Sequence, residues 1–316
     1  MSGFQAEGGT LKWCDQPATE LTIGQVRVAI KAAGLNRADL LQKAGMYPPP
    51  PGVTPVLGLE CAGEVIEVSG SSRWQKGDRV CALLSGGGMA EEVIVDGRHL
   101  LPVPEGMSWA EAAAIPEVFS TAWLNVFELG AAQPGEKVLI HAGASGVGTA
   151  AVQLCKAFGN PCWVTLGSEE KLQACIKLGA SGGALRQNGI ASLQSEGPFQ
   201  VALDPVGASY ASDHLDLLGV DARWVLIGLM GGREAKLDLA KMLIKRITLV
   251  GSTLRTRDTD FKAGLISRME EKLWPLFAAG TLKPMVAKTY DFAQAEDAFA
   301  ELAADRIVGK VILVRE

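Results

Sequence analysis

The chain has 316 residues, of which 48% are hydrophobic and 21% charged, and its formal net charge is -5. This length exceeds one ordinary hydrophobic core, so two domains are expected. The mildly acidic balance gives no electrostatic reason to expect a nucleic-acid partner, and no apolar run is long enough to span a membrane. Residues 1–7 lack the basic and apolar regions of a signal peptide, so the expected location is the cytoplasm.

Residues 1–115 consist of short runs that alternate in polarity and are separated by turns rich in Gly, Ser, Asp and Pro. This pattern predicts a compact antiparallel β-barrel. The expected strands are residues 25–31, 63–68, 78–83 and 89–95.

A candidate functional residue lies inside this first domain. Residues 36–43 are expected to form a short helix, and the four prolines at 48–51 then impose a stiff extended segment directly after Tyr47. Two readings of Tyr47 stay open at this point. It is either a site residue held on a rigid loop, or a ring that packs on that loop.

Residues 138–158 follow the pattern of a strand, a tight glycine-containing loop and a helix. Gly143, Gly146 and Gly148 let backbone N–H groups and the positive end of the helix approach a pyrophosphate without a Cβ in the way. Their spacing differs from the common G-x-G-x-x-G, so the loop alone is a weak signal. Ser145 does not fit the nucleophile of a G-x-S-x-G hydrolase motif, because Val147 stands where the second glycine of that motif is required.

Short apolar runs that end in Gly or Asp follow the loop, with helix-length segments between them. This is the pattern of a parallel sheet covered on both faces, and it predicts a doubly wound α/β domain. The expected strands are residues 161–167, 199–204, 223–228 and 247–251.

Several longer motifs, taken together, give a resemblance that covers both domains. The chain resembles the zeta-crystallin-like quinone oxidoreductases, which are zinc-free members of the medium-chain dehydrogenase/reductase superfamily, and most of all their tumour-suppressor-inducible branch. The motifs are residues 33–40, 47–52, 57–65, 76–80, 112–117, 138–148, 223–232 and 254–258. The resemblance implies a GroES-like catalytic domain of residues 1–115 and 260–316 around a Rossmann dinucleotide-binding domain of residues 116–259.

Zinc-dependent relatives hold a catalytic metal with a Cys and a His at the places of Asn36 and Leu59. Neither of these side chains is a good zinc ligand, so we expect no metal and therefore no Lewis acid. Direct hydride transfer to an electron-poor acceptor remains, in a dry cleft between the domains. Asn36 and Tyr47 are the catalytic candidates. For Tyr47 we rank positioning above proton donation, because an ordinary phenol is a poor acid.

The end of the second Rossmann strand bears on the choice of coenzyme. Gly167 and Ser168 replace the acidic residue that would bind the ribose of NAD, and Lys171 follows, which favours a 2′-phosphate and hence NADPH. Ser168 could instead be only an N-cap with acidic residues in the first helical turn. Arg186 stands where the family usually has Tyr, and it either stacks near the adenosine end or is a solvated surface residue.

The remaining expected NADPH contacts lie in the glycine loop, at the carboxyl ends of later strands and, by resemblance, at the start of the Rossmann domain and after its sixth strand. They are Thr121, Ala144, Ser145, Gly146, Val147, Gly148, Gly228, Leu229, Met230, Ser252, Thr253 and Leu254. The apolar edge at residues 247–250 is expected to pair with its copy in a homodimer.

We therefore expect an NADPH-dependent quinone oxidoreductase. Two alternatives stay open, because the assignment of substrate rests on resemblance. The same fold and coenzyme serve reduction of the activated C=C bond of alkenals or enones. A non-enzymatic, crystallin-like NADPH-binding protein is the alternative from another class.

Overall fold

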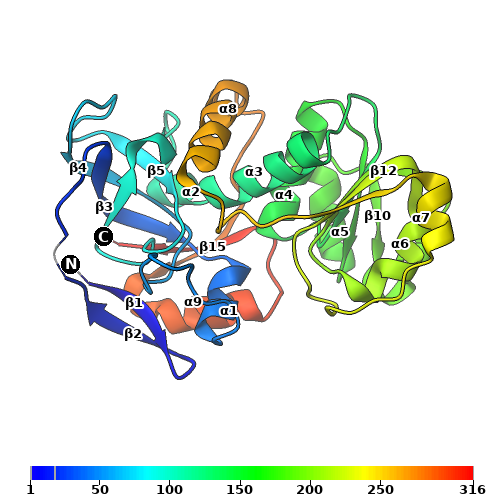
Figure 1. The fold of residues 1–316 in the computed structure, drawn as a ribbon, viewed down its shortest axis with the longest axis horizontal. Helices are drawn as coiled ribbons and strands as arrows, with labels where there is room; N and C mark the ends of the chain where they lie inside the picture. Colours follow the sequence, from blue (N-terminus) through cyan, green and yellow to red (C-terminus); the bar gives the residue numbers. More distant parts are fainter. Residues whose placement is uncertain (1, 18, 316) are drawn as a thin grey trace. The chain divides into compact units, whose positions relative to one another are not determined.

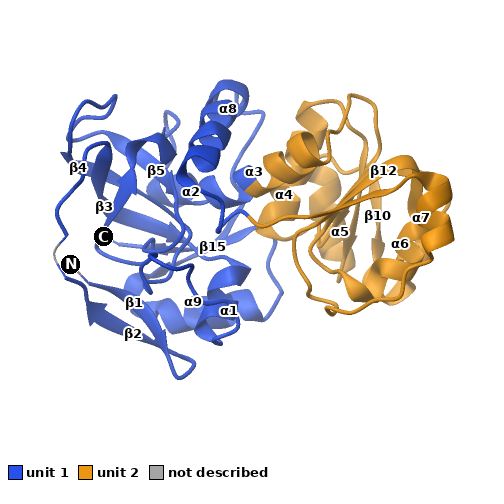
Figure 2. Cartoon of the chain, viewed as in Figure 1, with its two compact units in different colours: residues 1–120, 254–316 blue, residues 121–253 orange. Residues whose placement is uncertain are grey.

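The computed structural model describes residues 2–17 and 19–315, which form two compact units (Figure 2). The first unit contains residues 1–120 and 254–316, and the second contains residues 121–253. The sequence predicts one dinucleotide-binding domain of residues 116–259. The structure places the segments on either side of the second unit together in the first.

The first unit is built on a mixed sheet, and its elements before the second unit are β1 (Ser2–Glu7), β2 (Thr10–Asp15), β3 (Gln25–Gly34), α1 (Arg37–Lys43), β4 (Glu60–Val68), β5 (Arg79–Leu83), β6 (Glu92–Asp96), β7 (Leu100–Pro102), α2 (Trp109–Ala113) and α3 (Pro116–Trp123). Those after it are α8 (Thr259–Ala278), β14 (Val286–Asp291), α9 (Ala295–Ala303) and β15 (Lys310–Val314). Helix α3 runs across the boundary between the units.

Among the described residues of this unit, seven strands form the main sheet, in the order β14-β15-β3-β4-β5-β7 with β6 paired to β3. All of its pairs are antiparallel except β14 with β15, which are parallel. Alternate residues of β3, such as Val26, Val28 and Ile30, face the core, as the alternation in the sequence predicts. The strand expected over residues 89–95 begins later, at Glu92, and Ala90 instead makes an isolated bridge with Gly3.

The second unit contains β8 (Val138–His141), α4 (Gly146–Ala157), β9 (Cys162–Leu166), α5 (Glu169–Leu178), β10 (Gly182–Leu185), β11 (Phe199–Asp204), α6 (Ala211–Leu217), β12 (Leu218–Leu226), α7 (Leu239–Lys245) and β13 (Thr248–Gly251). A π-helix, Leu124–Leu129, continues α3. Among the described residues six strands pair, all in parallel, in the order β10-β9-β8-β11-β12-β13. Helices α4 and α5 cover one face and α6 and α7 the other (Figure 1).

This strand order reverses at β8, from which β9 and β10 lie to one side and β11, β12 and β13 to the other. That arrangement is the doubly wound Rossmann fold, and ligands of such sheets bind at the carboxyl ends of the strands beside the reversal. The predicted glycine loop directly follows β8, so the fold places it at this point. The α/β class expected from the sequence, a Rossmann sheet with a GroES-like domain, is confirmed.

Candidate active site

The glycine loop of the second unit closes tightly between β8 and α4. Ser145 is the N-cap of α4, and its Oγ accepts a hydrogen bond from the Gly148 N–H at 3.1 Å. A Cβ on Gly148 would lie 2.5 Å from the carbonyl oxygens of Ala142 and Gly143. A Cβ on Gly143 would lie 2.5 Å from Val164 on the neighbouring strand. Both positions therefore require glycine for the close approach of loop, helix and strand.

The first turn of α4 is suited to an anion. Its twelve residues carry no acidic side chain in that turn, so nothing cancels the positive end of the helix dipole. Ala144 is buried and Val147 is half-buried, so the loop keeps its shape by packing. These properties fit the pyrophosphate of a dinucleotide.

The end of β9 carries the residues expected to select the coenzyme. Ser168 is the N-cap of α5 and accepts a hydrogen bond from the Lys171 N–H at 3.4 Å, so its N-cap role is real. Lys171 is buried although its helix begins with two exposed glutamates. Arg186 is exposed, and its Nη2 lies 2.6 Å from where a Cβ of Gly167 would stand. The structure thus places a guanidinium directly against the end of the second strand.

The segments after β12 and β13 offer one unsatisfied polar atom. Ser252 is buried, and its Oγ has no hydrogen-bond partner among the described residues. Buried hydroxyls normally have a partner, so an absent ligand would satisfy it. Leu229 and Met230 are exposed, beside Gly228 in the turn after β12. Thr253 closes the second unit, whereas Leu254 is buried in the first.

Thr121 lies at the other end of the second unit, on α3. It is half-buried, and its carbonyl oxygen accepts a hydrogen bond from Asn125 Nδ2 at 2.7 Å. The Asn125 Oδ1 atom is buried without a partner among the described residues.

Asn36 belongs to a buried ionic cluster in the first unit. Lys310 Nζ lies 2.6 Å from Glu60 Oε1 and donates to Asn36 Oδ1 at 2.7 Å. The Asn36 Nδ2 in turn donates to Glu60 Oε1 at 3.0 Å. Glu60 and Lys310 are almost completely buried, so the amide is held in one orientation from both of its ends.

Two further carboxyl groups belong to the same cluster. Asp39 accepts hydrogen bonds from the backbone N–H groups of Asn36, at 2.8 Å, and Gly58, at 3.0 Å. Burial raises the pKa of Asp39 to about 6, although these two hydrogen bonds act to lower it. Burial, followed by the negative charge of Glu60, raises the pKa of Glu117 to about 8, so the Glu117 carboxyl is mostly neutral at pH 7.

Tyr47 is half-buried on the proline loop, and its ring packs against a buried guanidinium. The Arg255 Cζ lies 5.2 Å from the centre of the ring. The Tyr47 hydroxyl makes no hydrogen bond with any residue in the described ranges 2–17 and 19–315, so it is available to a ligand. Burial raises the pKa of this phenol, and the charge of Arg255 opposes the rise.

Zinc ligands do not gather at this cluster. Within the described residues, no three His, Cys, Asp or Glu side chains are placed to hold a metal ion. Leu59, at the place of the relatives' His, is buried and apolar. Cys61 and Cys81 are buried as well, and burial raises the pKa of both thiols far above the ordinary range.

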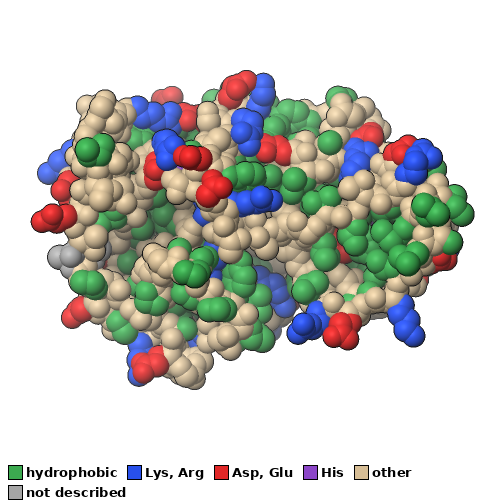
Figure 3. All heavy atoms as spheres, viewed as in Figure 1, with side chains coloured by type: hydrophobic (Ala, Val, Ile, Leu, Met, Phe, Trp, Pro, Cys, Tyr) green, Lys and Arg blue, Asp and Glu red, His purple; other side chains and the backbone are tan. Residues whose placement is uncertain are grey.

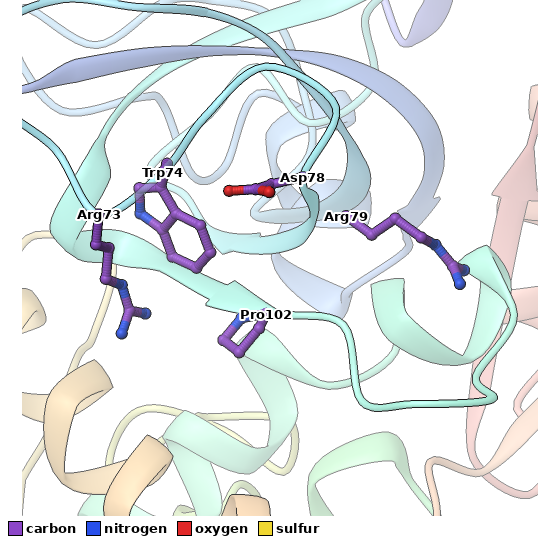
Figure 4. Close-up of a pocket in the computed structure, with 5 residues that line it drawn as sticks. All are labelled: Arg73, Trp74, Asp78, Arg79 and Pro102. Atoms are coloured by element: carbon purple, nitrogen blue, oxygen red, sulfur yellow. The ribbon is translucent and has the colours of Figure 1, made fainter.

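A hollow of about 340 Å³ elsewhere on the first unit is lined by Arg73, Trp74, Asp78, Arg79 and Pro102. Figure 4 shows the Asp78 carboxylate pointing toward the Trp74 indole, whereas the Arg79 guanidinium points away. Arg73 is already paired with Glu270 at 2.8 Å. No residue expected from the sequence to act in catalysis or binding lines this hollow.

Comparisons with known proteins agree with this architecture. The family described as Alcohol dehydrogenase GroES-like domain matches residues 22–105, and the one described as Zinc-binding dehydrogenase matches residues 146–271. The human synaptic vesicle membrane protein VAT-1 homolog is 31% identical over 322 residues, which cover 92% of this chain and 79% of that protein. The chain belongs to the zeta-crystallin-like family of medium-chain dehydrogenases/reductases. Both matching family models carry descriptions of dehydrogenases.

Two solved structures show the same fold over the whole chain. The quinone oxidoreductase of Thermus thermophilus, solved also in complex with NADPH, is 32% identical with a TM-score of 0.85 and full coverage of both chains. The CurK enoyl reductase is 28% identical with a TM-score of 0.86, over 99% of this chain and 98% of that one. Polyketide synthases of Streptomyces and Mycobacterium are 32% to 35% identical, and the chain spans 5% to 15% of their length.

Five residues of the first unit that hold the candidates in place were not among the expected site residues. They are Asp39, Glu60, Glu117 and Lys310 of the ionic cluster and Arg255 beside Tyr47, and all but Lys310 lie in motifs that carry the resemblance. A signal was present for Lys310, because it begins an otherwise apolar strand and is buried there.

Among the described residues, none of the helices has both the length and the apolar character needed to cross a membrane.

Proposed function

We propose that the chain is an NADPH-dependent quinone oxidoreductase that transfers hydride directly to the quinone. The observation that carries this proposal is the fixed amide of Asn36, locked by Glu60 and Lys310 where zinc-dependent relatives hold a metal ligand. An amide and the phenol of Tyr47 can hydrogen-bond an acceptor oxygen, but they cannot polarise an alcohol as a metal does. The acceptor must therefore be electron-poor before it binds, as quinones are.

The second unit supports a nicotinamide coenzyme. The turn at residues 143–148 would hold the pyrophosphate, and the unsatisfied Ser252 Oγ would accept or donate a hydrogen bond at the carboxamide. When bound, the coenzyme supplies the hydride. The chain's own residues bind and orient both reactants, which is the main protein contribution to such a transfer.

The side chains at the end of β9 support NADPH, and not NADH, as the coenzyme. Lys171 and Arg186 provide two cations there, and Gly167 and Ser168 provide no carboxylate for a free ribose diol. A guanidinium is well suited to a phosphate because it offers paired donors. The Thermus quinone oxidoreductase, which was solved with NADPH, supports the same choice.

Reduction of an activated C=C bond is the second candidate. The structural match to the CurK enoyl reductase favours it, as do the polyketide synthases that this chain matches in part. Both reactions use the same hydride donor, so the fold does not separate them.

Steady-state NADPH oxidation with a matched panel tests the proposal. Naphthoquinone and phenanthrenequinone are compared with an alkenal, an enone and a crotonyl thioester, each with NADPH and with NADH. We expect the highest kcat/KM with a quinone and NADPH. Higher kcat/KM with the thioester would establish the second candidate, whereas tight NADPH binding with no turnover of any acceptor would support the non-enzymatic alternative.

We also propose that the protein forms a homodimer through β13. This strand is the edge of the sheet in the second unit, and its Leu249 is exposed. Leu239, Leu243 and Ile244 on the adjacent α7 are more than 70% exposed, and apolar side chains gather over this helix in Figure 3. An open strand edge beside an apolar helix face is a typical subunit contact.

A further inference from the structure

Two cations are buried in the first unit without a carboxylate partner. Arg255 follows the return of the chain from the second unit and is 4% exposed, and Lys262 on α8 is 3% exposed. Neither forms an ion pair with a carboxylate within residues 2–17 and 19–315. Buried charges are normally paired, because removing a charge from water is costly.

Neutral oxygen atoms hold both cations in place. Arg255 Nε donates to the Ser85 carbonyl at 2.8 Å, and its Nη2 donates to Gln42 Oε1 at 2.7 Å. Lys262 Nζ donates to the Arg255 carbonyl at 2.8 Å and to the Ser85 hydroxyl. These contacts fix the geometry but do not cancel the charge, so a positive potential remains at this place.

The side chain of Tyr47 lies beside the Arg255 guanidinium, within this positive potential. The Arg255 guanidinium lies 5.2 Å from the centre of the Tyr47 ring, and its Nη1 also approaches the Tyr47 carbonyl at 3.4 Å. The Tyr47 hydroxyl has no hydrogen-bond partner within the described ranges. An oxygen that accepts a hydrogen bond from this hydroxyl is therefore exposed to the charge of Arg255, and Lys262, which is held on the Arg255 carbonyl, adds to the same positive potential.

The surrounding titratable groups leave this potential in place at neutral pH. Glu117 is mostly neutral at pH 7, since burial and Glu60 raise its pKa to about 8. The charge of Glu60 is taken up by Lys310. Asp39 is mostly ionised at pH 7, because its pKa is about 6, so it offsets part of the potential of Arg255 without forming an ion pair with it. Asp258 is exposed and caps α8. His99, which also faces Lys262, is kept neutral because burial lowers its pKa.

We propose that Arg255 and Lys262 form a cationic platform that stabilises negative charge on the acceptor oxygen bound to the Tyr47 hydroxyl. The substrate class is then an acceptor whose reduction leaves an oxyanion, such as a quinone. Hydride addition to a quinone carries two electrons and gives a hydroquinone monoanion, while NADPH becomes NADP+. The oxyanion then takes one proton, from Tyr47 or from water. Arg255 is a positioning residue in this scheme, because it acts through Tyr47.

The inference rests on the proposed function, but its test requires neither coenzyme nor turnover. Para-nitrophenol is titrated with the protein, and its phenolate absorbance is followed against pH. We expect the wild-type protein to bind the phenolate and to raise the ionisation constant of the bound probe about tenfold or more. Arg255→Gln should abolish this increase and Arg255→Lys should restore part of it.

Arg257→Gln is the matched control, because Arg257 is a neighbouring cation that stacks on Phe261. This variant should behave as the wild type. If Arg255→Gln fails to fold, Lys262→Met is used in its place, with the same expectation. A probe that does not bind, or an ionisation constant unchanged by both variants, would overturn the platform even in an active reductase. Conversely, an Arg255-dependent shift in a protein that reduces no quinone would leave the platform standing and reject the proposed function.

Discussion

Lys310 and Glu60 form an ion pair with a 2.6 Å Nζ to Oε1 distance, although they belong to the two separate chain segments of the first unit. Both hydrogen-bond the Asn36 side chain. The pair therefore links the fold of this unit to the orientation of one expected catalytic amide.

Lys310→Met should destabilise the protein by about 3–5 kcal/mol, because it leaves the Glu60 carboxylate buried without its counter-charge. Chemical denaturation measures this loss. The matched control is Lys288→Met, which removes an exposed pair with Glu301 and should cost about 1 kcal/mol or less. Equal losses in the two variants would show that the interior pair has no special role. The double variant Lys310→Met with Glu60→Leu should recover much of the stability.

Lys171→Glu should reduce the affinity for NADPH about tenfold or more and leave the affinity for NADH nearly unchanged, because it replaces attraction to a phosphate by repulsion. Fluorescence titration with each nucleotide measures the change. Lys177→Glu on the same helix is the control, since Lys177 is exposed and near the far end of α5. An equal effect on both nucleotides would remove Lys171 from the phosphate site.

The buried histidine pair of the second unit should make the protein less stable in acid. His141 Nε2 lies 3.3 Å from His214 Nε2, and the Nδ1 of His214 has no partner among the described residues. Burial lowers the pKa of both histidines below the ordinary value of 6.5. The unfolded chain then binds more protons than the folded one below that pH, so stability is fully present above about 6.5 and is lost as the pH falls.

Urea unfolding at a series of pH values tests this behaviour. His214→Phe, which keeps an aromatic ring against Trp224, should flatten the loss of stability between about pH 6.5 and pH 4. Asp213→Asn at the exposed neighbouring position is the control and should keep the wild-type slope. A slope unchanged in His214→Phe would assign the acid sensitivity to other groups.

Leu243→Glu combined with Ile244→Glu should convert a dimer to a monomer, because charges on α7 would be buried in the proposed contact. Light scattering after gel filtration gives the mass. Ile23→Glu is the control, since Ile23 is 88% exposed in the first unit. A wild-type monomer, or a double variant with an unchanged dimeric mass, would contradict the β13 contact.

The sequence was most informative where the pattern is local. Apolar runs bounded by glycines predicted β8, α4 and β11, and the alternation of polarity predicted β3. Strand β10 was not predicted, because Gly182 and Gly183 give it neither alternation nor β propensity. The strand expected from Arg223 begins earlier, at Leu218, and passes through a positive-φ residue at Asp221.

The candidate site was predictable only in part, because its contacts join distant parts of the chain. Asn36 and Tyr47 were chosen as candidates from sequence motifs, but their partners Lys310 and Arg255 lie more than 200 positions away in the sequence. No spacing rule connects residues so far apart. The position of a Lys at the head of an apolar strand is visible in the sequence, but its burial and its partner are not.

Single-turnover oxidation of NADPH carrying deuterium at nicotinamide C4 tests direct hydride transfer to a quinone most directly. Enzyme, coenzyme and naphthoquinone are mixed without oxygen, and the decay of NADPH is compared for the two isotopic forms. We predict rapid oxidation that is slower with the deuterated coenzyme, with one hydroquinone formed for each NADPH. The account would be contradicted if no quinone-dependent oxidation occurred, or if only a crotonyl thioester supported the reaction.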